Sequence, residues 1–423
     1  MSNRKTVSLL RKTLSDGEGI IRLAPTWVPR SFSTPGGRMK LCKQDLYALG
    51  ADRGGIDERW LASTIGADNG PGTPEDEGLS YIVVEDGGRK EKILFKHAID
   101  LLGDDFLGKG VMNRYAGWQV LTKLYDNQGS IPHHVHQTDE EAAKVGTRGK
   151  SEAYFFPRQL NQVENNFPYT FFGLEPGTTK QQVIDCLSRW NDGDNGILYL
   201  TKAYKIKAGT AWNIPAGILH GPGSLVTYET QQASDVFAMY QSVLEGRVVP
   251  RDLLTRNIPI EHKDDPEYIV ENTLVWHLNV DPEFAKNHFM PLLPVDDPEI
   301  MGDKGYYEQW ISYQSEHFSA KELTVFPNKS VVIVDSAAYG VIVVQGRGLM
   351  GKMEIESPTL IRFREMTGDE LFITADAASA GVKIKNTSSF ENLVMLKHFG
   401  PGNPDLEENS DMLGEILSSR REG

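Results

Sequence analysis

Two histidines separated by a single residue are the strongest chemical signal in this chain. They lie within residues 131–137, a stretch that carries three of the ten histidines of the protein. On a β-strand successive side chains point to opposite faces, so His134 and His136 would project together, with Val135 on the other face. Two imidazoles on one face suit a divalent metal ion, although an exposed strand end could carry the same pattern. A metal site therefore requires further ligands elsewhere in the chain.

Two downstream residues are candidates for these ligands. Glu152 leads into an aromatic run, and His220 lies in residues 208–223, where a Gly turn, a short apolar run and a Pro-x-Gly turn predict a strand–turn–strand edge. Three histidines and one glutamate complete a metal shell with room for water or substrate. Glu140 and Glu141 are alternative carboxylates, but their charged surroundings predict a mobile loop, and a strand holds a ligand more firmly.

The elements that must position these residues are mostly strands. Short apolar runs punctuated by Gly and Pro predict strands over residues 20–64, 118–172 and 197–243, and similar runs return over residues 313–400. The length of 423 residues suits two or more domains, so these runs predict two β-rich halves. Residues 65–90, rich in Gly, Asp and Pro, predict a loop.

Helices are predicted where apolar residues recur at helical spacing. These segments are residues 5–15, 94–107 and 180–190, with a terminal helix expected after Met412. Between the two β-rich halves, three Asp-Pro pairs at residues 265–266, 281–282 and 297–298 signal turns or helix starts. We expect this stretch to connect the halves and to pack against both.

Composition excludes several classes of protein. The net charge of −14 argues against nucleic-acid binding, which requires a basic face, and it repels an anionic ligand unless a local basic patch compensates. With only two cysteines, Cys42 and Cys186, the composition argues against a disulfide framework. The start of the sequence has no apolar secretory signal, and no stretch approaches about 18 consecutive apolar residues. We therefore expect a cytoplasmic protein without a membrane span.

Seven further segments occur in an order found in a known family. They are Ile21–Pro25, Pro35–Arg38 with its GG turn, Glu58–Ser63 with the pattern E-x-W-x-x-S, Val120–Asp126, Leu174–Thr179, Tyr228–Asp235 with E-x-Q-Q-x-S-D, and Glu316–Phe318. Together with the histidine motif, these segments resemble the type I mannose-6-phosphate isomerases of the cupin superfamily. The resemblance runs across most of the chain.

The resemblance implies a mainly β bicupin, two double-stranded β-helix barrels with short inserted and connecting helices. Residues 1–246 would form a metal-binding cupin domain with an N-terminal extension, and residues 247–312 a connector. Residues 313–400 would form a second cupin domain, followed by an acidic tail over residues 401–423. The second half has no histidine between His317 and His398, so it lacks the paired motif and should hold no metal site.

The resemblance also assigns the metal shell. The family places its glutamate ligand in a G-K-x-E segment, which corresponds to Glu152 here, so the expected ligands are His134, His136, Glu152 and His220. The family usually has glutamine where His134 stands. Zinc is the expected ion, and the additional nitrogen donor makes iron, manganese or nickel alternatives.

Catalytic residues follow from position and from the resemblance. Lys150 lies two residues before Glu152, so a strand would place both on one face, and a lysine beside a dication can lose its proton and act as a base. The family has pocket residues at the positions of Lys123 and Glu229, and either Lys150 or Glu229 could be the base. Glu58 also matches a family pocket position, and Glu58 and Glu229 could instead cap a turn or brace a ligand histidine.

The expected function is a metal-dependent aldose–ketose isomerase acting on a sugar phosphate. Glu58 and Arg247 are expected to bind substrate. Met239 stands where the family has a pocket arginine, and loss of a cation weakens a phosphate site unless Arg247 or Arg251 compensates. An isomerase or epimerase of an unphosphorylated sugar, or a sugar-binding regulatory cupin without turnover, are the alternatives.

Overall fold

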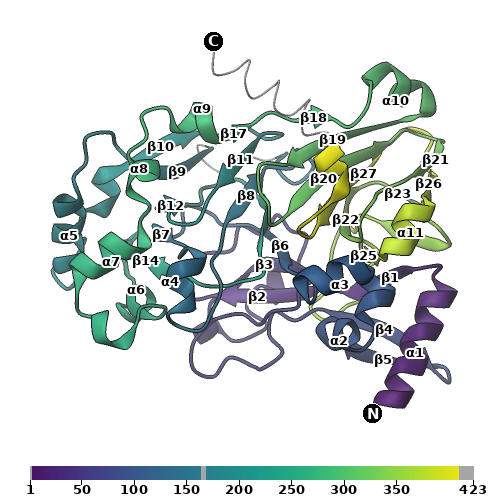
Figure 1. The fold of residues 1–423 in the computed structure, drawn as a ribbon, viewed down its shortest axis with the longest axis horizontal. Coiled ribbons are helices and arrows are strands. Elements are labelled where there is room, and N and C mark those ends of the chain that lie inside the picture. Colours follow the sequence, from purple (N-terminus) through teal and green to yellow (C-terminus); the bar gives the residue numbers. More distant parts are fainter. Residues whose placement is uncertain (1, 163–167, 409–423) are drawn as a thin grey trace.

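The computed structural model describes residues 2–162 and 168–408. Its strands form two barrels that lie side by side, one at each end of the long axis (Figure 1). The fold class expected from the sequence, mainly β with two barrels and short helices, is confirmed.

The first barrel consists of a seven-stranded and a five-stranded antiparallel sheet. The larger sheet contains, in order, β17 (Phe289–Met290), β11 (Ala211–Ile214), β8 (Glu152–Phe155), β13 (Thr227–Gln232), β6 (Val120–Tyr125), β3 (Gly55–Leu61) and β2 (Thr26–Arg30). The smaller sheet contains β10 (Thr201–Lys205), β9 (Tyr169–Leu174), β12 (His220–Gly221), β7 (His134–Val135) and β14 (Ala238–Met239). Aromatic residues such as Tyr154 and Phe172 pack between the two sheets.

The second barrel is built in the same way. Its larger sheet contains β18 (Leu293–Pro294), β19 (Tyr306–Ser312), β20 (Ser319–Val325), β27 (Leu393–Phe399), β22 (Tyr339–Gln345), β25 (Glu370–Ile373), β1 (Ile20–Ala24), β4 (Tyr81–Asp86) and β5 (Arg89–Leu94). Its smaller sheet contains β21 (Ser330–Ile333), β26 (Val382–Asn386), β23 (Arg347–Met350) and β24 (Met353–Glu356). An aliphatic core fills this barrel.

The chain crosses between the barrels more often than the sequence indicates. β1 pairs with β25, so a strand near the N-terminus joins the sheet of the second barrel and brings the β4–β5 hairpin with it. The hairpin also lies partly where a loop was predicted. The expected connector contributes to both barrels, because β17 extends one sheet while β18 and β19 extend the other. Strand edges that are far apart in sequence are thereby covered.

Helices cover the ends and outer faces of the barrels. They are α1 (Asn3–Asp16), α2 (Phe95–Leu107), α3 (Lys109–Tyr115), α4 (Asp139–Ala143), α5 (Lys180–Ser188), α6 (Asp252–Thr255), α7 (Pro266–Thr273), α8 (Trp276–Asn279), α9 (Phe284–His288), α10 (Pro298–Lys304), α11 (Ala375–Ala380) and α12 (Pro404–Glu408). Thr179 and Gln182 form a capping box at the start of α5, and Asp265 and Asp297 cap α7 and α10 ahead of a proline. The predicted terminal helix after Met412 lies outside the described residues.

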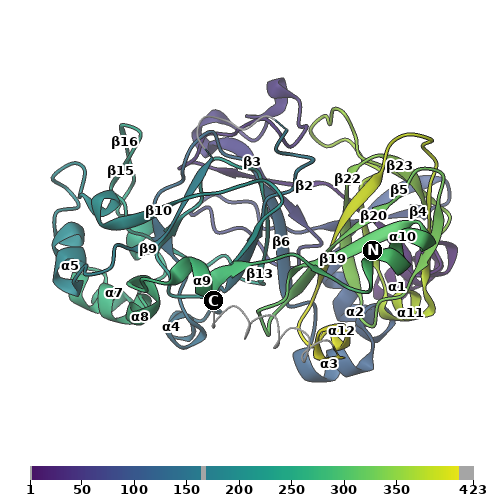
Figure 2. The ribbon, with the colours of Figure 1, turned by 90° about the horizontal axis from the view of Figure 1, so that it is seen from above.

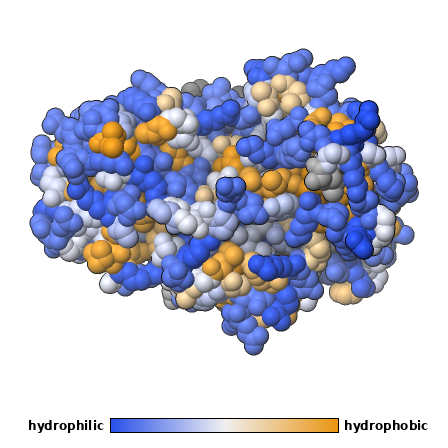
Figure 3. All heavy atoms as spheres, turned by 90° about the horizontal axis from the view of Figure 1, so that it is seen from below, coloured by the Kyte–Doolittle hydropathy of each residue, from blue (hydrophilic) through white to orange (hydrophobic). Residues whose placement is uncertain are grey.

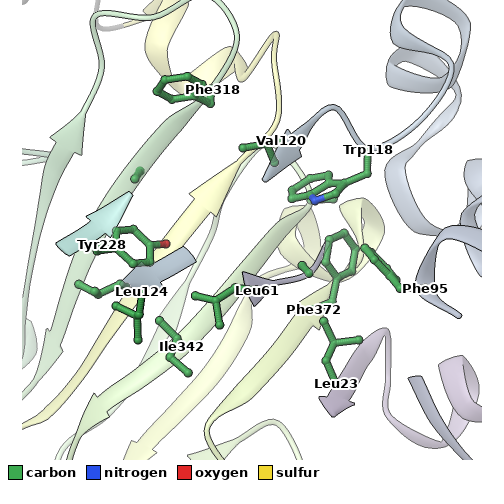
Figure 4. Packing of buried hydrophobic residues seen from close by; sticks show 14 of the residues in the cluster. Leu23, Leu61, Phe95, Trp118, Val120, Leu124, Tyr228, Phe318, Ile342 and Phe372 are labelled. Atoms are coloured by element: carbon green, nitrogen blue, oxygen red, sulfur yellow. The ribbon is translucent and has the colours of Figure 1, made fainter. Parts of the chain in front are cut away.

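A further hydrophobic core lies between the two barrels. Leu124 and Tyr228 from the first barrel pack toward Ile342 and Phe372 from the second (Figure 4). The Tyr228 hydroxyl and His398 Nδ1 are 2.9 Å apart. Gly340 permits this approach of His398, since a Cβ on that glycine would lie 2.2 Å from the imidazole Nε2. The barrels are therefore packed as one unit.

A strand motif recurs in both barrels although the paired histidines do not. A Glu-x-Trp sequence on β3 places Trp60 opposite Lys123, and the same sequence on β19 places Trp310 opposite Lys321. In the second barrel the Lys321 ammonium binds Asp335 at 2.8 Å, and Asp335 also binds Lys397 at 2.7 Å. The motif therefore lies beside a small cluster of buried charges in each barrel.

The outer surface is mostly hydrophilic. The face drawn in Figure 3 is predominantly blue, with small separate apolar areas. Among the described residues, no helix has the length and apolar character required to span a membrane.

Candidate metal centre

The three predicted histidine ligands converge on one buried point of the first barrel. His134 on β7 lies directly opposite His220 on β12, and His136 follows β7. One nitrogen atom from each imidazole can be chosen so that all three lie within 4.8 Å of one another. The side chains are buried, with 1–4% of each residue exposed. The i, i+2 spacing thus places His134 and His136 together, as predicted.

Backbone carbonyls determine which imidazole nitrogen faces the centre. Nδ1 of His134 lies 2.8 Å from the Pro132 oxygen, Nδ1 of His136 lies 2.7 Å from the Val236 oxygen, and Nδ1 of His220 lies 2.8 Å from the Ile218 oxygen. A carbonyl oxygen can only accept a hydrogen bond, so each Nδ1 carries the proton. Each Nε2 therefore presents a lone pair, which is the arrangement that a metal-binding histidine requires.

Glu152 is the carboxylate that the structure brings to these histidines. Its Oε2 lies 3.1 Å from His136 Nε2, and its Oε1 lies 3.0 Å from His220 Nε2. The Tyr154 hydroxyl donates to Oε1. Glu152 Oε2 and His220 Nε2 are buried and accept no hydrogen bond from the described residues. Three neutral nitrogens and one carboxylate with unused acceptors fit a divalent ion.

Burial keeps His134 and His136 neutral. Burial disfavours the imidazolium, and with the positive charge of Lys150 it lowers the pKa of His136 to about 3. Burial also lowers the pKa of His134 well below its usual value, with a further contribution from His220. His134 and His136 therefore need not lose protons when a cation binds at neutral pH.

Lys150 lies at the centre of the polar cluster. Its Nζ is 2.9 Å from His136 Nε2, 3.2 Å from Glu152 Oε2 and 3.4 Å from Glu229 Oε1. The prediction that Lys150 and Glu152 share one face agrees with these distances. The ammonium group contacts atoms that a cation held by these ligands would also contact, so this part of the barrel attracts positive charge.

Lys123 and Glu229 extend the cluster across the sheet. Glu229 on β13 pairs with Lys123 on β6, and their charged groups are 3.2 Å apart. Lys123 Nζ also lies 3.5 Å from Glu58 Oε1. Burial, followed by the charge of Glu152, raises the pKa of Glu229 to about 7 although both lysines oppose this shift. A carboxyl group with this pKa can exchange a proton near neutral pH.

Glu58 remains ionised for a different reason. Burial alone would raise its pKa, but Arg30, Lys123 and a 2.7 Å hydrogen bond from Trp60 Nε1 lower it to about 2. Trp60 lies two residues from Glu58 on β3, so both side chains face the barrel interior. The predicted substrate contact is therefore a firmly held carboxylate.

Arg30 belongs to this cluster and was not identified from the sequence. It ends β2, is 2% exposed, and places Nε 3.2 Å from Glu58 Oε1. One terminal nitrogen lies 2.9 and 3.0 Å from the two carboxylate oxygens of Asp235. In the sequence, an arginine directly after Thr-Trp-Val-Pro predicts only the exposed polar end of a strand. The long-range pairing that turns its side chain inward leaves no local signal.

Other predicted residues lie elsewhere. Glu140 is exposed on α4, and Glu141 binds Lys144 and Tyr268, so α4 replaces part of the predicted loop and directs both glutamates away from the histidines. His133 turns its ring toward Gln241, at 2.9 Å, rather than joining His134 and His136. Met239 pairs with His134 across β14 and β7 and is buried.

Arg247 lies apart from the cluster. It belongs to the two-stranded ribbon β15 (Val243–Leu244) and β16 (Arg247–Val248), is exposed, and its side chain pairs with Glu245 at 3.5 Å. Figure 2 shows this ribbon at the outer edge of the molecule, whereas β6 and β13 lie near the middle. No contact among the described residues joins Arg247 to the histidine cluster, and its role in substrate binding stays a prediction.

Comparisons with known proteins identify the architecture. No protein-family model and no curated protein sequence matches the chain. Solved structures do match. A putative mannosephosphate isomerase from Archaeoglobus fulgidus is 13% identical over 90% of this chain and 97% of its own, with a TM-score of 0.59. The mannose 6-phosphate isomerase from Bacillus subtilis is 18% identical over 90% and 99%, with a TM-score of 0.57.

A third solved structure carries information on metal. It is a zinc-bound mannose 6-phosphate isomerase that is 14% identical over 90% of this chain and 100% of its own, with a TM-score of 0.59. Each alignment spans nearly the whole of the solved chain, so the likeness covers both barrels and not one isolated motif. The chain has the two-barrel fold of the mannose-6-phosphate isomerases.

Proposed function

We propose that this protein is a metal-dependent aldose–ketose isomerase that acts on a sugar phosphate, as the mannose 6-phosphate isomerases of the same fold do. The observation that carries the proposal is the buried group of His134, His136, His220 and Glu152, whose nitrogens and carboxylate face one point inside the barrel. Zinc is the proposed ion, in keeping with the zinc-bound neighbour. It would supply a Lewis acid to polarise the sugar carbonyl.

The residues of the chain would perform the proton transfer. Interconversion of an aldose and a ketose moves a proton between two neighbouring carbon atoms, which requires a base close to the metal ligands. Lys150 and Glu229 lie 3.4 Å apart at that place. Glu229, with a pKa of about 7, can accept and return a proton at neutral pH, and Lys150 can hold the oxygen atoms of the substrate.

The direct test is turnover of mannose 6-phosphate by zinc-loaded protein. We expect fructose 6-phosphate as product, measured by a coupled assay, and loss of the activity on chelation. Glu229→Gln should lower kcat by roughly 100-fold to 10,000-fold, the range for removal of a general base, with metal content unchanged. If the metal-loaded protein converts no sugar phosphate, the proposed activity is wrong.

A second prediction concerns the phosphate group. Lys123 and Arg247 are the two candidate cations for binding the phosphate. Lys123 lies inside the barrel, and Arg247 lies outside it. Loss of a charged partner of phosphate removes about 1.5–3 kcal/mol of hydrogen bonding, which corresponds to a roughly tenfold to hundredfold rise in KM.

The matched assay compares Lys123→Ala and Arg247→Ala on mannose 6-phosphate and on mannose. A residue that holds the phosphate should raise KM for the phosphorylated sugar only. Equal effects on both sugars would exclude that residue as the phosphate contact.

A further inference from the structure

The charged residues of the first barrel form a continuous row that alternates in sign. The row begins at Asp235, between β13 and β14, and ends beside the histidines; its members in order are Asp235, Arg30, Glu58, Lys123, Glu229, Lys150 and Glu152. Each neighbouring pair lies within 2.9–3.5 Å. The seven side chains are at most 9% exposed, so water screens these interactions weakly. Removal of one member must therefore redistribute the others.

Arg30 is the member that balances the outer half of the row. It faces two carboxylates, Glu58 and Asp235, and its terminal nitrogens also reach Asn69 at 3.0 Å. Its guanidinium group packs 5.7 Å from the centre of the Trp60 ring. Because a guanidinium presents several donors in a rigid plane, it can hold both carboxylates at once, which a lysine cannot do equally well.

Lys123 is shared between the two halves of the row. Its ammonium lies 3.5 Å from Glu58 and 3.2 Å from Glu229, so small changes in charge decide which carboxylate it favours. With Arg30 present, Glu58 is already paired with a cation and with Trp60. Without Arg30, Lys123 would be the remaining cation in contact with Glu58 and would move away from Glu229.

We propose that Arg30 is a positioning residue for the isomerisation: by neutralising Glu58 and Asp235, it leaves Lys123 to hold Glu229 beside Lys150, where Glu229 meets the substrate. The inference rests on the proposed function for its catalytic meaning. The effect of Arg30 on Lys123 and Glu229 does not depend on catalytic activity, so it can be measured separately.

The titration of Glu229 reports this arrangement directly. The titratable groups that face Glu229 are Lys123 and Tyr125 from β6, Glu58 from β3, Glu152 and Tyr154 from β8, and Lys150 ahead of β8. In Arg30→Met, Glu229 loses part of the field of Lys123, so its pKa should rise. Carbon NMR of zinc-loaded protein labelled at glutamate carboxyl carbons measures this pKa, with Glu229→Gln to assign the resonance.

The kinetic readout should agree. In Arg30→Met, kcat for mannose 6-phosphate should fall by on the order of 100-fold, the effect of a misplaced catalytic group, with zinc content unchanged. The acidic limb of the rate–pH profile should move to higher pH. Guanidinium chloride at millimolar concentration should restore part of the rate in Arg30→Ala, and Arg30→Lys should lie between the wild type and Arg30→Met.

Arg59→Lys is the matched control. Arg59 is also a buried arginine with two carboxylate partners. It follows Glu58 on β3, so its side chain lies on the other face of that strand, where it pairs with Asp369 and Glu370 of the second barrel. It should lose stability while keeping the wild-type pH profile. If Arg30→Met does not fold, the Glu229 pKa and the rate–pH profile are measured in Arg30→Lys instead.

The outcomes separate the two proposals. An unchanged Glu229 pKa in a folded, zinc-loaded Arg30 variant would overturn the positioning role, whatever the activity. Equal shifts in the Arg30 and Arg59 variants would do the same, since they would indicate a general loss of packing. Absence of turnover in the wild-type protein, with the Glu229 shift present, would overturn the proposed function alone.

Discussion

Replacement of His136 or His220 by alanine should abolish stable metal binding. Each change removes one of three neutral nitrogen donors and leaves a buried cavity beside the carboxylate of Glu152. Loss of a group that merely supports a metal ligand lowers metal affinity by roughly 10- to 100-fold, so loss of a ligand should exceed that range. Elemental analysis of purified protein after dialysis against a weak chelator measures the effect, and we expect about one zinc ion per wild-type chain.

Two glutamate variants test the identity of the carboxylate ligand. Glu152→Gln should deplete the metal because Oε1 and Oε2 face His220 and His136. Glu140→Gln should retain it because that side chain is exposed on α4. Full metal content in both histidine variants, or depletion by Glu140→Gln, would show that the ion binds elsewhere.

Replacement of Arg59 by alanine should destabilise the whole molecule. Arg59 is buried, and its guanidinium lies 2.7 and 2.8 Å from the oxygens of Asp369 and 3.1 Å from Glu370 across the boundary between the barrels. Removal of one partner leaves two buried carboxylates without a cation, which costs about 3–5 kcal/mol. Urea unfolding at pH 7 measures the loss, and Arg251→Ala, whose ion pair with Asp264 is exposed, should cost only about 0–1 kcal/mol.

The loss in Arg59→Ala should depend on pH. Burial raises the pKa of Glu370 from 4.5 to about 7 in the folded wild-type protein. The folded state therefore keeps a proton that the unfolded state has released between these pH values, so the contribution of Glu370 to stability declines as pH rises from 4.5 to 7. Without Arg59 the pKa of Glu370 should rise further, so the decline should continue to higher pH. A loss of stability that is equal at pH 5 and pH 7.5 would contradict this account.

The sequence alone predicted the class of fold, and it nominated His134, His136 and His220, which the structure brings together. Alternation along a strand predicted that His134 and His136 share one face, whereas the place of His220 opposite His134 depends on the long-range pairing of β12 with β7. Helix starts at Thr179, Asp265 and Asp297 were equally local, because a capping side chain and the following residues act within one turn.

Only the tertiary structure decided which charges surround the metal ligands and how the barrels are joined. Arg30 lies in the charged cluster because β2 pairs with β3 and because Asp235, more than 200 residues away in sequence, binds its guanidinium group. Arg247 lies outside the cluster because it belongs to the exposed β15–β16 ribbon. β1 joins the second barrel by pairing with β25, which no local pattern encodes. Side-chain type and strand period act over a few residues, whereas the partner of a strand edge or a buried charge is chosen by the packing of the whole chain.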